Sequence, residues 1–500
     1  MELISYQFAG FVSIILIVYY FLPRRAQNIW LLLASYGFYL TWSIRPALIL
    51  LATTLINLFA ARWLEPLAGK PPAPKTNRRL VLWALLVLNT GALLLFRLGS
   101  SGYASRLLSY LGRSNSSELS LDIHIILPIG FSFYILQIIS YLFDVYRGVL
   151  PANRSLVDFG LYLAYFPKML SGPIERAAPF LAQLAHPRQL QNEHLVKGAS
   201  LILVGLVRKL LLAEWLSHQI PADLFYAPAH HSWTMRLVGL LAYAFWLYND
   251  FAGYTSIVRG ISMLFGIELS INFKQPYFAR NFTEFWNRWH ITLSHWLRNY
   301  IFMPLSRYLL RRNRSRSKNG STNQVKTLVN ITLPPIITML VSGLWHSFGF
   351  YMIFWGALHG IFQVAERLLS YQKRIAPPDQ MPKWRQFVQA VIVFLLTCLA
   401  WVAFASGSLT RAFVYWKMLF TLSPVNSTTT ISWNQYVPAL VLIGITLILD
   451  SLQQRRHTEL PFLAWPLMGR AALLALVVFV FFINFLWGTV STTPFVYQGF

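Results

Sequence analysis

The sequence predicts an all-α polytopic membrane protein, and three observations lead to this prediction. Of the 500 residues, 56% are hydrophobic and only 12% are charged, which is about half the charge of a soluble chain. The hydrophobic residues form long runs, and a helix needs about 20 of them to cross a bilayer. Because hydrocarbon offers no partner to backbone polar groups, these runs are expected to be helical. The composition excludes a soluble enzyme, a disordered chain and a disulfide-built secreted domain.

The apolar runs predict about 11 to 13 transmembrane or re-entrant helical segments. The first run carries no charge and is followed by Arg24 and Arg25 instead of a small-residue cleavage site, so it is a span and not a signal peptide. The candidate segments are residues 3–22, 28–43, 46–61, 80–97, 123–143, 156–170, 195–213, 236–264, 326–345, 348–366, 386–405, 434–450 and 470–488.

Basic residues predict the orientation of the chain. Lys and Arg number 42 against 17 Asp and Glu, a net charge of +25, and the basic residues gather in short clusters between apolar runs. Such clusters stay on the cytoplasmic side of a membrane. The four clusters lie at residues 62–79, 307–318, 373–385 and 455–456. The polar loops near 98–122 and 406–433, and both chain ends, are then expected outside.

Polar residues within apolar surroundings are costly in a membrane and are the natural candidates for function. Ser132, Gln137, Ser140 and Asp144 recur on roughly one helical face. They either hydrogen-bond neighbouring helices or line a polar cavity. Residues 165–176 contain two prolines and a glycine, which excludes a continuous helix. This stretch is either a re-entrant loop, tolerated where it is buried in protein, or an ordinary cytoplasmic loop.

A third polar region runs from residue 248 to residue 300. Asp250 lies between two apolar runs. The pattern of residues 282–300 predicts one amphipathic helix that lies at the cytoplasmic interface. Asn281 or Thr283 would cap its start, and Glu284 and Arg288 would pair four positions apart. Its apolar stripe consists of Phe285, Trp289, Leu293, Trp296, Leu297 and Tyr300. His290 falls off this stripe, towards the polar side.

His346 follows about 15 mostly apolar residues and precedes another apolar run. A neutral imidazole in such surroundings needs hydrogen bonds or water, so both a structural and a catalytic role are open. The 11 histidines include no His-Glu-x-x-His or His-x-x-x-His pattern, and no metal site is expected. What remains for an enzyme is base catalysis by histidine.

The polar stretches together resemble the membrane-bound O-acyltransferase (MBOAT) family. The resemblance follows the chain in order over residues 125–365, and it is carried by residues 127–148, 165–176, 250–254, 272–304 and 343–360. Within the family, the sequence is most similar to the bacterial branch of alginate O-acetylation and teichoic acid D-alanyl transfer proteins. The aromatic ending at 494–500 also resembles that branch.

The resemblance implies a helical core around a central cavity. It implies one polytopic domain over 1–500, with peripheral helices in 1–122, the catalytic core in 123–370 and further helices in 371–500. An acyl thioester would enter from the cytoplasm, and the acceptor hydroxyl from the other side. Two departures stand out: Ser347 follows His346 where the branch usually has glycine, and Asn299 follows Arg298 where it usually has aspartate.

The resemblance also implies roles for particular residues. His346 takes the position of the family's near-invariant histidine and acts as general base, which burial favours by keeping the ring neutral. His290 takes the second, more variable polar position. His290, or the indole N–H of Trp289 or Trp345, would stabilise the oxyanion or orient the thioester. Asp250 and Arg288 are further candidates for the pocket around them.

The expected function is that of a multi-pass O-acetyltransferase of the bacterial inner membrane. It would use acetyl-CoA or an acyl carrier protein as thioester donor, with no bound cofactor, and modify a cell-surface or exported polysaccharide directly or through a periplasmic transferase. Binding to nucleic acid is not expected. Transfer of D-alanine or another acyl group to a teichoic acid-like polymer is the alternative within the enzyme class. A transporter or scaffold without chemistry is the alternative from another class.

Overall fold

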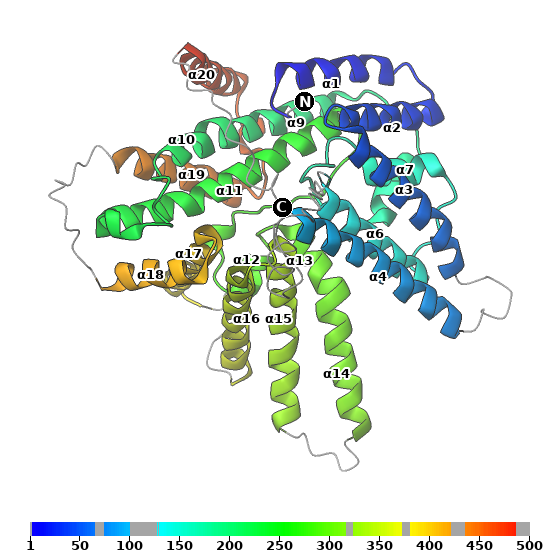
Figure 1. Cartoon of the computed structure of the whole chain (residues 1–500). Coiled ribbons are helices and arrows are strands. Elements are labelled where there is room, and N and C mark those ends of the chain that lie inside the picture. Colours follow the sequence, from blue (N-terminus) through cyan, green and yellow to red (C-terminus); the bar gives the residue numbers. More distant parts are fainter. Residues whose placement is uncertain are drawn as a thin grey trace, which may run out of the picture. The chain divides into compact units, whose positions relative to one another are not determined.

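The computed structural model describes residues 3–65, 75–100, 128, 130–316, 324–372, 381–421 and 436–486, and throughout these ranges the regular elements are helices (Figure 1). The described chain forms two compact units. Unit 1 comprises residues 1–199 and 258–270, and unit 2 comprises residues 200–257 and 271–500. Two helices, α9 (Asn192–Leu206) and α11 (Trp233–Leu264), contribute to both units.

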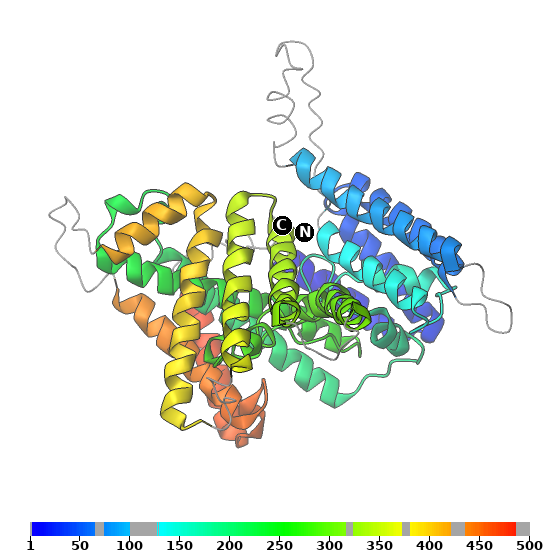
Figure 2. The same cartoon turned by 90° about the horizontal axis from the view of Figure 1, so that it is seen from below.

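Unit 1 is built mainly from the N-terminal helices. Helix α7 packs against α2 and α3, and α4 lies alongside α6 (Figures 1 and 2). The elements are α1 (Tyr6–Tyr19), α2 (Arg24–Leu40), α3 (Ile44–Ala61), η1 (Arg62–Leu64), α4 (Lys75–Ser100), α6 (Phe131–Tyr146), α7 (Leu156–Ala164) and α8 (Ala177–Leu184).

Unit 2 holds the remaining elements. They are the π-helix η2 (Val207–Ala213), α10 (Glu214–His218), η3 (Pro228–His230), η4 (Pro276–Phe278), α12 (Phe282–Trp286), α13 (Ile291–Leu297), the π-helix η5 (Arg298–Phe302), α14 (Met303–Arg316), α15 (Gln324–His346), α16 (Phe350–Tyr371), α17 (Lys383–Ser406), α18 (Leu409–Phe420), α19 (Val437–Arg456), η8 (Pro461–Ala464) and α20 (Leu467–Leu486).

Helices α15 and α16 of unit 2 run side by side (Figures 1 and 2). Glycines make this approach possible. A Cβ atom on Gly343 would lie 2.1 Å from the carbonyl oxygen of Met352, and one on Gly356 would lie 2.3 Å from that of Met339. At each glycine the backbone of one helix therefore meets the backbone of the other. Gly343 lies three residues before His346.

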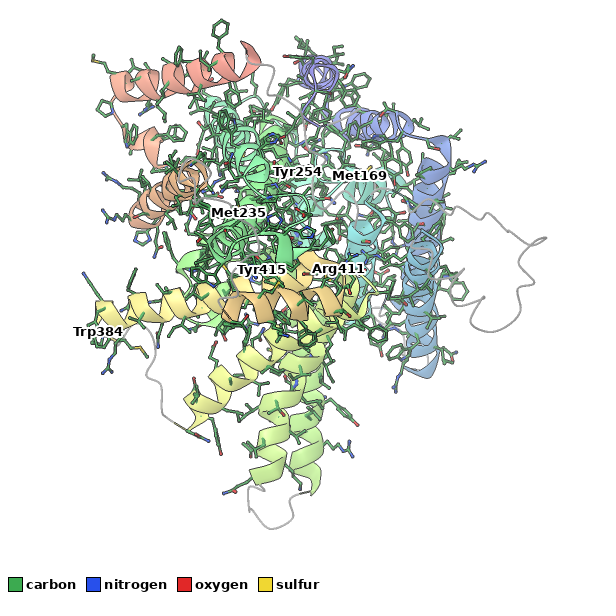
Figure 3. The ribbon with its side chains drawn as sticks, turned by 60° about the vertical axis from the view of Figure 1, so that its left-hand side comes forward. Met169, Met235, Tyr254, Trp384, Arg411 and Tyr415 are labelled. Atoms are coloured by element: carbon green, nitrogen blue, oxygen red, sulfur yellow. The ribbon has the colours of Figure 1, made fainter. Side chains whose placement is uncertain are left out.

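The predicted helical fold is confirmed, since each of the thirteen apolar segments contains a helix within the described residues. In the part of the chain that the structure describes, five helices are long and apolar enough to cross a membrane, and α1, α6 and part of α20 are shorter apolar helices. These helices keep apolar faces exposed. Figure 3 shows Trp384 at the outer end of α17, where its side chain is 63% exposed, whereas Trp401 on the same helix is buried. The chain is a multi-pass membrane protein.

The prediction of one continuous helix over residues 282–300 is wrong. His290 has a left-handed backbone, with φ of 41°, and separates α12 from α13. The local details were predicted correctly: Asn281 accepts a hydrogen bond from the backbone N–H of Glu284 at 2.6 Å, and Arg288 pairs with Glu284 at 2.6 Å. His290 was expected towards the polar side of the helix, but it is buried, as is most of the apolar stripe.

The irregular stretch after α7 is buried within unit 1. Residues 165–175 are irregular, with turns over 166–171, and none of their side chains is exposed, as expected for a loop enclosed by protein. The polar residues of α6 hold this stretch in place: Gln137 accepts a hydrogen bond from Lys168, and Asp144 pairs with Arg176 at 2.8 Å. These contacts favour the interpretation that the polar face of α6 binds neighbouring elements.

Some predictions concern residues outside the described part of the chain. They are the portions of the basic clusters and polar loops within residues 66–74, 101–127, 317–323, 373–380 and 422–435, and the aromatic ending at 494–500. The division into segments 1–122, 123–370 and 371–500 stays a prediction.

Candidate active site

The structure brings three of the predicted site residues together in unit 2. His346 ends α15, and the centroid of its ring lies 4.8 Å from that of Trp345. The centroid of the His290 ring lies 6.1 Å from that of the same tryptophan, Trp345. The residue exposure of His346 is 4% and that of His290 is 1%. One tryptophan therefore stands between two buried histidines that are 56 positions apart in the sequence.

Packing from three helices fixes the position of His346. The glycine contact between α15 and α16 sets the distance between these helices, and the chain then turns at Ser347, whose hydroxyl accepts a hydrogen bond from Tyr351 at 3.3 Å. Trp355 on α16 and Phe404 on α17 approach the imidazole edge-on, at 5.2 and 5.4 Å between centroids. An imidazole held this way has little rotational freedom, which suits a group that must meet a reacting atom.

His290 is held by a strained turn. A left-handed backbone costs a residue with a side chain about 1–2 kcal/mol, and such strain persists only where surrounding contacts enforce it. Asn272 supplies these contacts. Its carbonyl accepts from the N–H of Ile291 at 2.9 Å, and its side-chain oxygen accepts from both the N–H and the hydroxyl of Thr292. Phe251 packs edge-on against the His290 ring at 4.9 Å.

The burial of His290 predicts a pH-dependent stability. Burial lowers the pKa of His290 from its ordinary 6.5 to about 3. Above pH 6.5 the ring is neutral in both folded and unfolded chains; between about 6.5 and 3 only the unfolded chain binds the proton. We expect the thermal midpoint of the protein in detergent to fall as pH drops from 7 to 5. In His290→Asn, which tolerates the left-handed backbone, the fall should be smaller, and an equal fall would contradict this assignment.

The other predicted residues lie in ion pairs or in packing. Asp250 pairs with Lys209, which the π-helix η2 places towards α11. Arg288 pairs with Glu284. Burial raises the pKa of Glu284, but hydrogen bonds from Arg280 and the charges of Arg280 and Arg288 outweigh burial, so the pKa of Glu284 is lowered.

Trp289 belongs to the aromatic packing around the site. Its indole lies 5.0 Å from that of Trp401, and the Trp401 ring stacks at 5.9 Å on that of Trp355. Trp355 in turn contacts His346. Trp289 is thus connected to the histidine through two tryptophans that the sequence did not single out.

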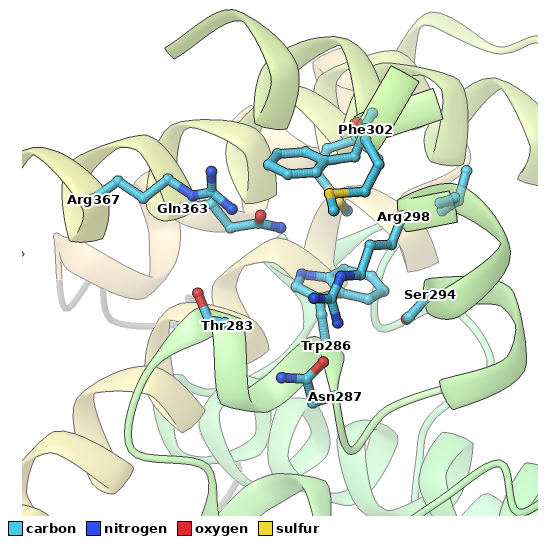
Figure 4. Close-up of a pocket in the computed structure, with 12 residues that line it drawn as sticks. Thr283, Trp286, Asn287, Ser294, Arg298, Phe302, Gln363 and Arg367 are labelled. Carbon is cyan, nitrogen blue, oxygen red and sulfur yellow. The ribbon is translucent and has the colours of Figure 1, made fainter. Parts of the chain in front are cut away.

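A cavity of about 260 Å³ lies next to this aromatic packing (Figure 4). Trp286 forms part of its wall, and the Trp286 ring lies 6.0 Å from that of Trp355. In Figure 4 the guanidinium group of Arg298 lies by the ring of Trp286, and Gln363 and Arg367 extend from the neighbouring helix α16. The lining residues within the described chain are Thr283, Trp286, Asn287, Ser294, Leu297, Arg298, Phe302, Met303, Thr338, Met339, Gln363 and Arg367.

The charge of this cavity favours an anionic ligand. Two guanidinium groups line it, and its described lining includes no carboxylate. Arg367 lies over the Phe302 ring at 4.7 Å, while the nearby Glu366 accepts hydrogen bonds from the backbone of Phe282 and Thr283. Among the described residues, no three histidine, cysteine or acidic side chains gather as metal ligands. The site therefore offers neutral bases, indole donors and fixed positive charge.

Comparison with known proteins identifies the family of the chain. The model of the MBOAT, membrane-bound O-acyltransferase family matches residues 84–410. The chain is 33% identical over 464 residues to a probable alginate O-acetylase AlgI of Azotobacter vinelandii, covering 92% of this chain and 85% of the relative. It is 30% identical over 440 residues to a peptidoglycan O-acetyltransferase of Helicobacter pylori, covering 82% of this chain and 77% of the relative.

A third relative is named for a different activity. The chain is 28% identical over 292 residues to a teichoic acid D-alanyltransferase of Streptococcus thermophilus, covering 55% of this chain and 68% of the relative. The family match spans more than half of the chain and includes the histidine cluster and the cavity. On this evidence the protein belongs to the membrane-bound O-acyltransferase family and is an acyltransferase.

Proposed function

We propose that this acyltransferase moves acetyl groups from a cytoplasmic thioester donor across the bacterial inner membrane, for O-acetylation of a cell-surface or exported polysaccharide. The observation that carries the proposal is the pair of buried histidines around Trp345, joined through Trp355 and Trp286 to a cationic cavity. The relatives named as O-acetylases and O-acetyltransferases support acetyl as the transferred group. D-alanyl transfer remains the alternative, since that relative matches a smaller share of the chain.

In this proposal His346 is the general base. The acceptor hydroxyl gives its proton to the imidazole while its oxygen attacks the thioester carbonyl carbon. The C–S bond then breaks, and the thiolate takes the proton back from His346. A histidine accelerates such a step because its ordinary pKa lies close to neutral pH. His290, or the indole N–H of Trp289 or Trp345, would stabilise the negative charge on the carbonyl oxygen or orient the thioester.

The donor would enter through the cavity beside Trp286. A phosphopantetheine arm, either on coenzyme A or on a carrier protein, is anionic at one end and apolar along its length. Arg298 and Arg367 suit the phosphate, and Phe302, Met303 and Met339 suit the arm. On the positive-inside rule the basic clusters near α14 and α17 would face the cytoplasm, with both chain ends outside.

The test of the function is O-acetylation in cells. With His346 replaced by alanine, we expect the O-acetyl content of the envelope polysaccharide to fall to the level of a strain that lacks the gene. The matched control is His186→Ala, since His186 is an exposed histidine of unit 1. Unchanged O-acetyl content at a normal level of His346→Ala protein would contradict the proposal, and loss of D-alanine esters instead would favour the alternative.

The cationic cavity predicts an effect on donor affinity. A hydrogen bond to a charged group contributes about 1.5–3 kcal/mol, so Arg298→Met and Arg367→Met are each expected to raise the KM for acetyl-CoA at least tenfold with little change in kcat. Initial rates of transfer from radiolabelled acetyl-CoA by the purified protein measure both constants. Arg411→Met on α18, outside the cavity (Figure 3), is the control. Equal KM values for the three variants would argue against this entry route.

A further inference from the structure

A third histidine lies in the same aromatic cluster. His359 is on α16, four residues after Trp355, and its exposure is 0%. Its ring centroid lies 4.9 Å from that of Trp355 and 5.1 Å from that of Trp286. Trp355 therefore contacts His346 and His359, while Trp286 connects His359 to the cavity.

The polar atoms of this group are not satisfied by the described part of the chain. Neither ring nitrogen of His359 has a hydrogen-bond partner there, and the same is true of the indole N–H groups of Trp286 and Trp355. Buried polar groups almost always have a partner. An imidazole carries at least one N–H in either protonation state, so three neighbouring buried side chains each offer an N–H donor.

Apart from Trp401, whose ring lies edge-on at 6.3 Å, the remaining ring neighbours of His359 are phenylalanines. Phe285 stacks on the imidazole at 6.0 Å, and Phe362 and Phe282 lie edge-on at 5.9 and 6.4 Å. Phenylalanine at position 359 would fill this space without a buried polar atom. A histidine here, with two indole donors beside it, fits a ligand that carries an oxygen acceptor into an otherwise apolar cluster.

We infer that His359 is a further catalytic residue, which donates a hydrogen bond to the carbonyl oxygen of the acyl thioester. The inference rests on the proposed function for the identity of the donor. The N–H of His359 stabilises the negative charge that forms on this oxygen when the acceptor hydroxyl attacks, and the neighbouring Trp286 and Trp355 are further indole donors. No covalent bond to His359 forms. The proton that leaves the hydroxyl goes to His346, whose ring also contacts Trp355.

Binding of two analogues to the purified full-length protein tests the contact without turnover. Acetyl-CoA has the carbonyl oxygen, whereas S-ethyl-CoA has the same length but a methylene in its place. One hydrogen bond contributes up to about tenfold in affinity, so the native protein should prefer acetyl-CoA by about this factor. His359→Phe should bind the two analogues equally, and His359→Gln, which keeps an N–H donor, should retain part of the preference. The same pair built on 4′-phosphopantetheine distinguishes a carrier-bound donor from coenzyme A.

The control is Phe362→Leu, which removes packing from the same ring without removing a donor. It should lower the melting temperature and keep the preference for acetyl-CoA. His359→Phe should also lower the kcat for acetyl transfer about 10²–10³-fold, the usual effect of removing one oxyanion donor. A preference that persists in His359→Phe would overturn the inference. Equal losses of the preference for acetyl-CoA in His359→Phe and His359→Gln would also overturn it, because they would indicate a structural role. A native protein that prefers acetyl-CoA but transfers no acetyl would contradict the proposed function alone.

Discussion

His346→Gln is expected to lower the rate of the chemical step by about 10²–10⁴-fold, the range that positioned general bases contribute. Glutamine keeps the size and a hydrogen-bonding end of the side chain but cannot accept a proton near neutral pH. Because Trp345, Trp355 and Phe404 enclose the position, the substitution should leave the packing and the donor KM close to native values. Single-turnover transfer of radiolabelled acetyl by the purified protein measures this rate.

The control for this prediction is a histidine of the other unit. His186→Gln should transfer acetyl at the native rate, since His186 is exposed and belongs to unit 1. A reduction of less than tenfold in His346→Gln would mean that another group takes the proton. A parallel rise in KM and fall in melting temperature would mean that His346 only maintains the packing of α15.

Gly343→Ala is expected to produce the second large effect. The added Cβ would lie 2.1 Å from the backbone carbonyl of Met352, so α15 and α16 must move apart. Overpacking of this kind costs about 1–3 kcal/mol, and a displacement of roughly 1 Å at a reacting group can cost 10²-fold in rate. We expect a lower melting temperature together with at least a 10²-fold loss of acetyl transfer, measured on the same preparation.

Gly444→Ala on α19 is the matched control. No atom beyond the helix's own backbone lies within 4 Å of an added Cβ at this position, and alanine favours a helix over glycine by about 1 kcal/mol. The variant should therefore be as stable and as active as the native protein. Normal activity in Gly343→Ala would show that the close approach of α15 and α16 does not position His346.

The helices could be predicted because their signal is local. A run of about 20 apolar residues has one stable form in lipid, and every predicted segment contains a helix within the described chain. The cap at Asn281 and the Glu284–Arg288 pair were predictable for the same reason, since each depends on residues three or four positions apart. His346 and His290 were singled out by their apolar surroundings and by the family resemblance.

The arrangement of the site depends on contacts that no local pattern contains. The left-handed turn at His290 is imposed by Asn272, 18 positions earlier in the sequence, so the amphipathic pattern of residues 282–300 was interpreted as one helix. The partner of Asp250 is Lys209, which is aligned by a π-helix. The cavity combines Arg298, Gln363 and Arg367 from two elements.

The sequence around His359 carries the same kind of signal as that around His346. His359 stands in an apolar run between Leu358 and Gly360, in the same kind of surroundings that drew attention to His346. Only its position beside Trp286 and Trp355 connects it with the cavity. A buried histidine within one turn of a buried tryptophan is therefore worth testing in sequences of this kind.

The measurement that tests the central claim most directly is affinity labelling with bromoacetyl-CoA. This analogue places an alkylating carbon where the acetyl methyl group of a donor would lie, and an imidazole nitrogen displaces the bromide. If His346 faces the donor's acyl group, mass spectrometry of the labelled full-length protein will find the adduct on His346, and excess acetyl-CoA will prevent it. An adduct on another residue that acetyl-CoA suppresses equally, with His346 unmodified, would contradict the account.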